Sequence, residues 1–200
     1  MVPFSTAKEL LGASPVYTPE DVESVFGVTY SSEQRDALAS IPFSEETLRA
    51  CAGTHVLFPG YGLSLLDIRE RHSNLFFAKT GGWFGQEQHA FSRVPVPVRW
   101  HLLRMEPVPE SFLKSWQEQQ TLLLPDEEVP SAATVTFATM LHFKVTGVRL
   151  FKSSYVRTSD VDADGFRVFV GLFVDDGFDV YSVWDDRRAV LGLASARRSS

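Results

Sequence analysis

Two aspartate-rich turns that end in glycine divide the last third of the chain into three apolar segments. The turns are residues 162–165 and 175–177, and the segments around them are 148–157, 166–174 and 178–184. The segments are rich in β-branched and aromatic residues, and an Asp-Gly pair between such runs is typical of a hairpin. The sequence therefore predicts an antiparallel meander over residues 148–200, with 189–196 as a candidate fourth strand.

The middle segment of this meander is apolar on both faces. One face carries the alternate residues from Phe166 to Val174, and the other carries Phe169, Gly171 and Phe173. A strand of this kind is either covered on both sides or covered on one side and used for binding on the other.

The N-terminal part has a different composition. Residues 1–53 contain six Glu and two Asp, whereas residues 148–200 contain eight Asp and no Glu. Glu favours helices, while Asp favours caps and turns. The sequence thus predicts one α+β domain over residues 1–200, with short helices first, a strand meander last and helices packed on its sheet.

Helix boundaries can be placed from capping residues. Thr18 followed by Pro19 starts one helix, and Ser31 or Ser32, Ser44 and Ser64 start others. Residues 111–124 form a further helix with Trp116 and Gln120 on its apolar stripe. Residues 75–84 are expected to form a hairpin with its turn at 80–82. Residues 94–104 are expected to form an edge strand. Segment 131–146 fits a helix by its length and a strand by its alternation, and we favour the helix.

Composition limits the class of protein. The single cysteine, Cys51, excludes an intrachain disulfide and is expected to be a buried thiol. No signal peptide or membrane-spanning run is present in the sequence, so we expect a cytoplasmic protein with no membrane partner. The net charge of -6 argues against nucleic acid as a partner. Oligomeric state cannot be read from these features.

Several stretches resemble hypothetical proteins from diverse bacteria. They are residues 100–124, 127–130, 155–160, 184–187 and 193–197, which span roughly the last half of the chain. The resemblance implies a bacterial or phage source. It carries no activity, cofactor, partner or site residue over to this chain.

The loop 160–165 has the beginning of a calcium-binding pattern. Asp160, Asp162 and Asp164 occupy alternate positions before Gly165, as in loops that gather oxygen ligands around Ca²⁺. The twelfth position, however, is Gly171 instead of a bidentate Glu. The alternative is a hairpin turn whose carboxylates bond to nearby backbone N–H groups, and we weigh this alternative above the calcium site. No other cofactor is expected.

Charged residues are expected to gather at one rim of the meander. Arg157 and Asp160 lie near the end of the first strand, and Asp185, Asp186 and Arg187 follow the third. Such a set can hold a metal ion or clamp an anion, or it can be a surface ion-pair network. Together with Trp116 and Gln120, the residues Arg157, Asp185 and Arg187 are our candidate ligand-binding set.

The histidines show no zinc-binding spacing, and His142 lies in an apolar segment, so we expect it in the core. Residues 59–64 match neither a phosphate-binding loop nor a nucleophile elbow. The absence of a complete catalytic motif and the many aromatic residues favour a non-enzymatic binding module for a protein or a small molecule. Its binding surface is expected around Trp83, Phe84, Trp116 or Trp184.

Two alternatives remain open from the sequence. The first is a metal-assisted enzyme that acts on a phosphate or another anion through the Asp and Arg residues of the rim. The second is a phage or mobile-element accessory protein that blocks a host partner, which an acidic surface would suit.

Overall fold

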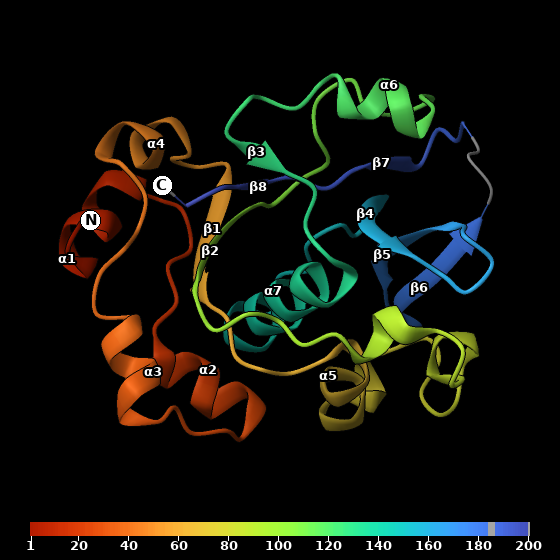
Figure 1. Ribbon diagram of the computed structural model, residues 1–200, viewed down its shortest axis with the longest axis horizontal. Helices are drawn as coiled ribbons and strands as arrows, with labels where there is room; N and C mark the ends of the chain where they lie inside the picture. The colour runs from red at the N-terminus through yellow and green to blue at the C-terminus, as the bar shows by residue number, and fades with distance from the viewer. Residues whose placement is uncertain (184–186, 200) are drawn as a thin grey trace.

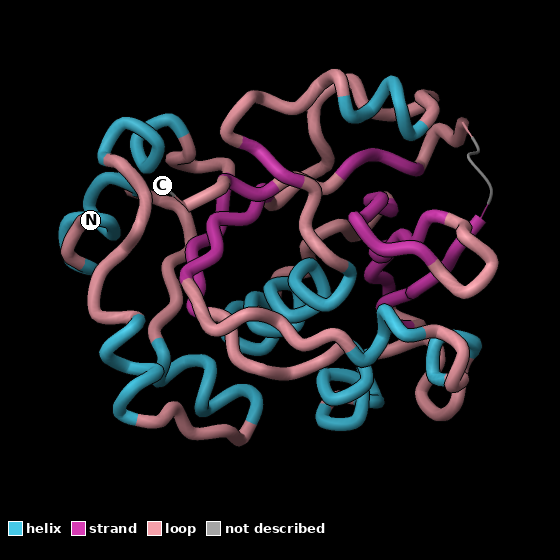
Figure 2. Tube along the Cα trace, viewed as in Figure 1, coloured by secondary structure: helices cyan, strands magenta, loops and turns pink. Residues whose placement is uncertain are grey.

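The computed structural model of the chain describes residues 1–183 and 187–199. Two four-stranded sheets lie on either side of a central helix (Figures 1 and 2). The first sheet has the order β1 (His55–Pro59), β2 (Trp100–Arg104), β8 (Ala196–Arg197), β3 (Glu127–Glu128) and is antiparallel. The second has the order β6 (Gly177–Val183), β5 (Arg167–Val174), β4 (Tyr155–Val161), β7 (Leu191–Leu193). The predicted α+β class is confirmed.

The C-terminal meander is present as β4, β5 and β6, which pair antiparallel in sequence order. Two details differ from the prediction. The first strand begins only at Tyr155, because residues 148–154 form a loop with turns. The candidate fourth strand is divided, since β7 pairs parallel to β4 while β8 joins the other sheet. The last residues of the chain therefore connect the two sheets.

Short helices precede β1, and the starts of the last three were predicted from their capping residues. They are α1 (Phe4–Leu11), α2 (Pro19–Phe26), α3 (Ser32–Ala37) and α4 (Glu45–Ala50). The hydroxyls of Thr18, Ser31 and Ser44 each accept a hydrogen bond from the third N–H of the helix that they start. These helices pack on the side of the first sheet, away from β6 (Figure 1).

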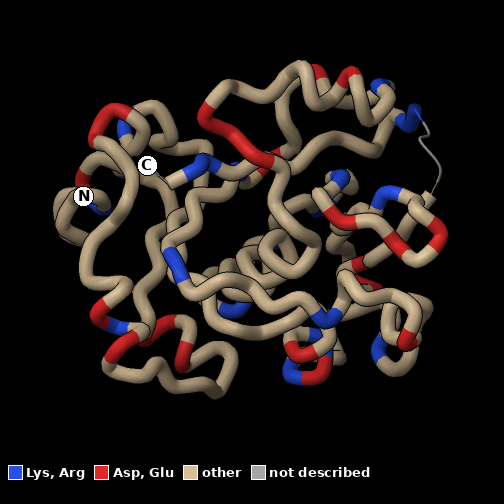
Figure 3. Tube along the Cα trace, viewed as in Figure 1, with Lys and Arg blue, Asp and Glu red and all other residues tan. Residues whose placement is uncertain are grey.

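Segment 131–146 is a helix, α7 (Ala132–Thr146), and it forms the centre of the molecule. Every residue from Ala132 to His142 is buried, and Lys144 is the helix's one charged residue (Figure 3). Phe137 stacks on Phe58 of β1 with ring centroids 5.8 Å apart, and Phe143 contacts Phe173 of β5 at 5.0 Å. The helix thus joins the cores of both sheets.

Short helices occupy the middle of the chain: α5 (Leu65–Arg71), α6 (Trp116–Gln120) and the 3-10 turns η1 (Ser73–Leu75), η2 (Trp83–Gly85) and η3 (Ala90–Arg93). Three predictions are wrong here. Residues 75–84 form no hairpin, the predicted strand 94–104 begins only at Trp100, and the predicted helix 111–124 shrinks to α6. Pro95 and Pro97 explain the late start of β2, because proline cannot donate to a strand ladder.

Candidate functional site

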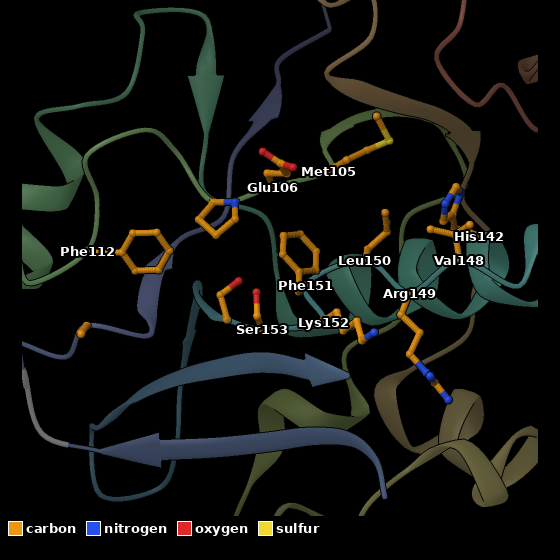
Figure 4. Close-up of a pocket in the computed structure, with 13 residues that line it drawn as sticks. Met105, Glu106, Phe112, His142, Val148, Arg149, Leu150, Phe151, Lys152 and Ser153 are labelled. Atoms are coloured by element: carbon orange, nitrogen blue, oxygen red, sulfur yellow. The ribbon is translucent and has the colours of Figure 1, made fainter. Parts of the chain in front are cut away.

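A groove of about 560 Å³ opens between the two sheets, beside the C-terminal end of α7. One wall is the segment 105–107, which follows β2, and the other is the loop 148–154, which leads from α7 to β4 (Figure 4). The lining residues extend in a row from Phe112 at one end to His142 at the other. Met105, Leu150 and Phe151 give this row an apolar surface.

The loop wall of the groove is fixed by backbone bonds to β5. Leu172 N donates to Ser154 O at 2.8 Å, and Phe173 N donates to Phe151 O at 3.2 Å. Phe151 has a φ of 53° and Leu172 a φ of 45°, values that non-glycine residues rarely adopt. Backbone of this kind persists only where the surrounding structure holds it, and such sites are often functional.

Arg149 attaches the same loop to the second sheet. Its guanidinium forms an ion pair with Asp175 at 2.8 Å and lies over the rings of Phe143 and Phe173, 5.2 and 5.3 Å from their centroids. Cation–π contacts of this type stabilise a partly buried cation. Arg149 therefore supports the groove wall with its charge already partnered.

His142 closes one end of the groove through a contact made early in the chain. Its Nδ1 lies 2.6 Å from the hydroxyl of Tyr17, and both side chains are buried. Burial raises the pKa of Tyr17 and lowers the pKa of His142, so both groups are neutral at pH 7. Within the described residues the Tyr17 hydroxyl has no other acceptor, so we infer that it donates its hydrogen to Nδ1.

The tautomer of His142 follows from this bond. A neutral imidazole whose Nδ1 accepts a hydrogen bond carries its own hydrogen on Nε2. That Nε2 has no partner in the part of the chain that the structure describes. Unlike Nε2 of His55 and His72, it is also not enclosed by protein atoms. With this tautomer, His142 lines the groove and carries an N–H donor at Nε2, although the sequence indicated only a core histidine.

Three further polar groups line the groove without a hydrogen-bond or ion-pair partner among the described residues. The hydroxyl of Ser154, a buried residue, makes no hydrogen bond to residues 1–183 or 187–199. In the same ranges, the ammonium of Lys152 has no carboxylate partner. The carboxylate of Glu106, on the opposite wall, has no Lys, Arg or His partner there. The groove accordingly combines apolar walls with a few unpaired polar groups.

The predicted ligand-binding set is only partly brought together. Around α6, Arg167 stacks on the ring of Trp116 at 3.9 Å, and Arg187 pairs with Glu118 at 3.0 Å. Arg157 lies buried under the same helix and donates to Lys114 O at 2.9 Å. Asp185 lies outside the described residues, as do Trp184 and Asp186.

The predicted position of Gln120 on the apolar stripe of its helix is wrong. Gln120 is exposed, whereas Gln119 is fully buried and accepts a hydrogen bond from Arg157 at 2.8 Å. The cause is the helix start, because α6 is capped by Ser115, not by Ser111. Ser115 and Glu118 form a capping box, a signal in the sequence that identifies this start.

The predicted calcium loop uses its carboxylates within the protein. Asp160 accepts from the backbone N–H of Ala132, at the start of α7, at 2.7 Å. Asp162 accepts from the N–H groups of Asp164 and Phe166 and from the hydroxyl of Ser182. The three carboxylates therefore do not converge, and no cluster of three potential metal ligands occurs in the described ranges. This arrangement matches the alternative of a hydrogen-bonded hairpin turn.

Trp83 and Phe84 do not form the aromatic binding surface that was predicted around them. Phe84 is buried, and Trp83 is half-buried and donates its indole N–H to Val180 O at 2.9 Å. Trp83 thus packs on β6, and neither ring lines the groove beside α7. Cys51 is buried, as predicted.

Sequence reasoning missed the groove because it assigned 148–157 to a strand. Three consecutive polar residues, 152–154, interrupt the alternation expected of such a strand and were a signal for a loop. No described helix has the length and apolar character that crossing a membrane requires. No protein-family model, curated protein or solved structure matches the chain.

Proposed function

We propose that this protein is a non-enzymatic binding module and that its ligand is a small molecule held in the groove between the two sheets. The observation that carries the proposal is the groove itself. Its volume of about 560 Å³ lies within the range of roughly 300–1,000 Å³ that is usual for small-molecule sites.

The composition of the groove supports the same proposal. Binding sites for small molecules are mostly apolar and contain a few polar groups that fix the ligand's orientation. Here Met105, Leu150 and Phe151 supply the apolar area, and His142 and Ser154 supply polar atoms without a partner among the described residues. The backbone bonds between the loop 148–154 and β5 make the site largely preformed, which lowers the entropic cost of binding.

The metal-assisted enzyme has less support among the described residues. The carboxylates of Asp160 and Asp162 already bond to the start of α7 and to their own turn. Arg157, the proposed anion clamp, is buried beneath α6. These groups would have to leave their partners to reach a substrate.

A fragment screen by ligand-observed NMR tests the proposal. Ser153 is exposed on the groove wall, so Ser153→Trp places a large ring over the opening. Ser5 on α1 is an equally exposed serine on the far side of the molecule, and Ser5→Trp is the matched control. We expect fragments that bind the wild type and Ser5→Trp but not Ser153→Trp. If no fragment binds, or if Ser153→Trp retains the same binders, the proposal is wrong.

A further inference from the structure

The unpaired polar groups along the groove are mostly hydrogen-bond donors. The Tyr17 hydroxyl fixes the tautomer of His142, so Nε2 offers a hydrogen and cannot accept one. The ring is held at 2.6 Å from that hydroxyl and stays in place without a ligand. A ligand atom that meets Nε2 must therefore be an acceptor.

The loop wall adds donors of a second kind. Lys152 contributes three N–H donors and a positive charge, and Ser154 contributes a hydroxyl. Ser154 is 8% exposed and His142 is 5% exposed, and both residues line the groove with a polar atom that has no hydrogen-bond partner among the described residues. Neither atom is fully enclosed by protein atoms, so a ligand in the groove can reach both.

The charge of the groove differs from that of the whole chain. The chain has a net charge of -6, yet the groove is lined by Lys152, Arg149 and a single described carboxylate, Glu106. Asp175 neutralises Arg149 from outside the lining, while Lys152 remains unpaired within the described residues. Glu106 on the opposite wall and Lys152 on the loop wall are both exposed, so water screens both charges.

We propose that the groove takes a small apolar carboxylic acid, whose carboxylate is received by the donors of His142, Ser154 and Lys152 and whose apolar body lies against Met105, Leu150 and Phe151. The inference rests on the proposed binding function and specifies its ligand class. Charge-assisted hydrogen bonds would give the acid its preference over uncharged analogues.

Three probes with one apolar body separate this inference from the proposed function. They are 4-phenylbutyrate, 4-phenylbutan-1-ol and 4-phenylbutylamine, titrated into the full chain and followed by NMR. The acid is expected to bind about tenfold more tightly than the alcohol, and the amine most weakly. If the alcohol or the amine binds the groove better than the acid, the ligand class is wrong while the binding function stands. If none of the three binds and the fragment screen is also empty, both fail.

Substitutions at the charged groups give a second readout. Lys152→Met should lower the affinity for the acid severalfold and leave the affinity for the alcohol unchanged. Lys8→Met, at an exposed position of α1, should change neither affinity. Glu106→Gln removes the only described carboxylate of the lining and should raise the affinity of the groove for the acid. Weaker binding of the acid to Glu106→Gln would instead show that this carboxylate attracts the ligand, which contradicts the inference.

The tautomer of His142 can be measured directly. Long-range ¹H–¹⁵N correlation spectra of the wild type should show hydrogen on Nε2, and 4-phenylbutyrate should shift that nitrogen. Hydrogen on Nδ1 would make Nε2 an acceptor and would overturn the inference. The double variant Tyr17→Phe with His142→Leu leaves no buried polar atom behind, and it should bind the acid about tenfold more weakly than the wild type. Unchanged affinity in the folded double variant would also overturn the inference.

Discussion

Arg157 in the middle of β4 donates a hydrogen bond to the side-chain oxygen of Gln119 in α6, over a distance of 2.8 Å. The amide nitrogen of Gln119 in turn donates to Ser111 O at 2.6 Å and to Leu191 O of β7 at 3.2 Å. One buried amide therefore connects α6, the segment before it and two strands of the second sheet. Its neighbour Gln120 is exposed and makes none of these contacts.

This contrast predicts different effects of the same substitution at adjacent positions. Gln119→Leu removes an acceptor from a buried guanidinium and leaves two carbonyls without their donor, so it should lower the free energy of unfolding by about 3 kcal/mol. Gln120→Leu should change it by less than about 0.5 kcal/mol. Urea denaturation of both variants measures the difference. Equal losses would contradict the assignment of Gln119 as the structural amide.

The second prediction concerns Gly171, where β5 departs from regular pairing opposite the groove wall. Its φ is 136°, and a Cβ at this position would lie inside contact distance of the Ser154 carbonyl oxygen. Gly171→Ala should therefore destabilise the protein by about 2 kcal/mol or more and disturb the loop 148–154. Gly62→Ala, at an open position without positive φ, is the matched control and should have little effect. Thermal unfolding of the two variants tests this, and similar melting temperatures would contradict it.

The third prediction concerns pH. Burial lowers the pKa of His55 and of His101 from 6.5 to about 4. Because the unfolded chain binds these protons at higher pH, stability is complete above pH 6.5 and is lost as the pH falls towards 4. The difference in pKa corresponds to about 3 kcal/mol for each histidine.

The variant His101→Phe tests this cause, because its ring can keep the stacking on Phe58, which has a centroid distance of 5.2 Å. We expect the variant to lose about 2 kcal/mol less stability between pH 7 and pH 4.5 than the wild type loses, because one buried histidine no longer titrates. Free energies of unfolding from urea titrations at several pH values give the comparison. An unchanged pH dependence would show that His101 titrates normally in the folded protein.

The fourth prediction separates a structural from a metal-binding role for Asp160. Its carboxylate accepts from Ala132 N at the start of α7, so Asp160→Ala should cost about 1 kcal/mol of stability. Asp164 is exposed, and Asp164→Ala is the control. The loss of stability in Asp160→Ala should be the same in EDTA and in millimolar Ca²⁺, as measured by thermal unfolding. A cost that appears only with Ca²⁺ would favour the calcium loop.

Much of the fold could be predicted from local signals. The Asp-Gly turns identified β4, β5 and β6, and the capping residues Thr18, Ser31 and Ser44 identified helix starts. These signals act over a few residues and need no knowledge of tertiary contacts. The central helix α7 was recognisable by its length and by Gly147, which ends it with a φ of 74°.

The remaining features depend on contacts between distant segments. The separation of β7 from β8 and the parallel pairing of β7 with β4 arise from long-range strand pairing. The Tyr17–His142 bond joins residues 125 positions apart, so no local pattern indicates that His142 presents a donor to a cavity. The register of Gln119, by contrast, was available from the capping box at Ser115.

The central claim is that the groove beside α7 is the binding site, and chemical-shift mapping of 4-phenylbutyrate on ¹⁵N-labelled protein tests it most directly. The account predicts concentration-dependent shifts at the amides of Leu150, Phe151 and Ser154 and at the ring nitrogens of His142. It predicts no shifts at Phe84, a buried residue that does not line the groove. Saturable shifts that cluster away from the loop 148–154, with His142 unaffected, would contradict it.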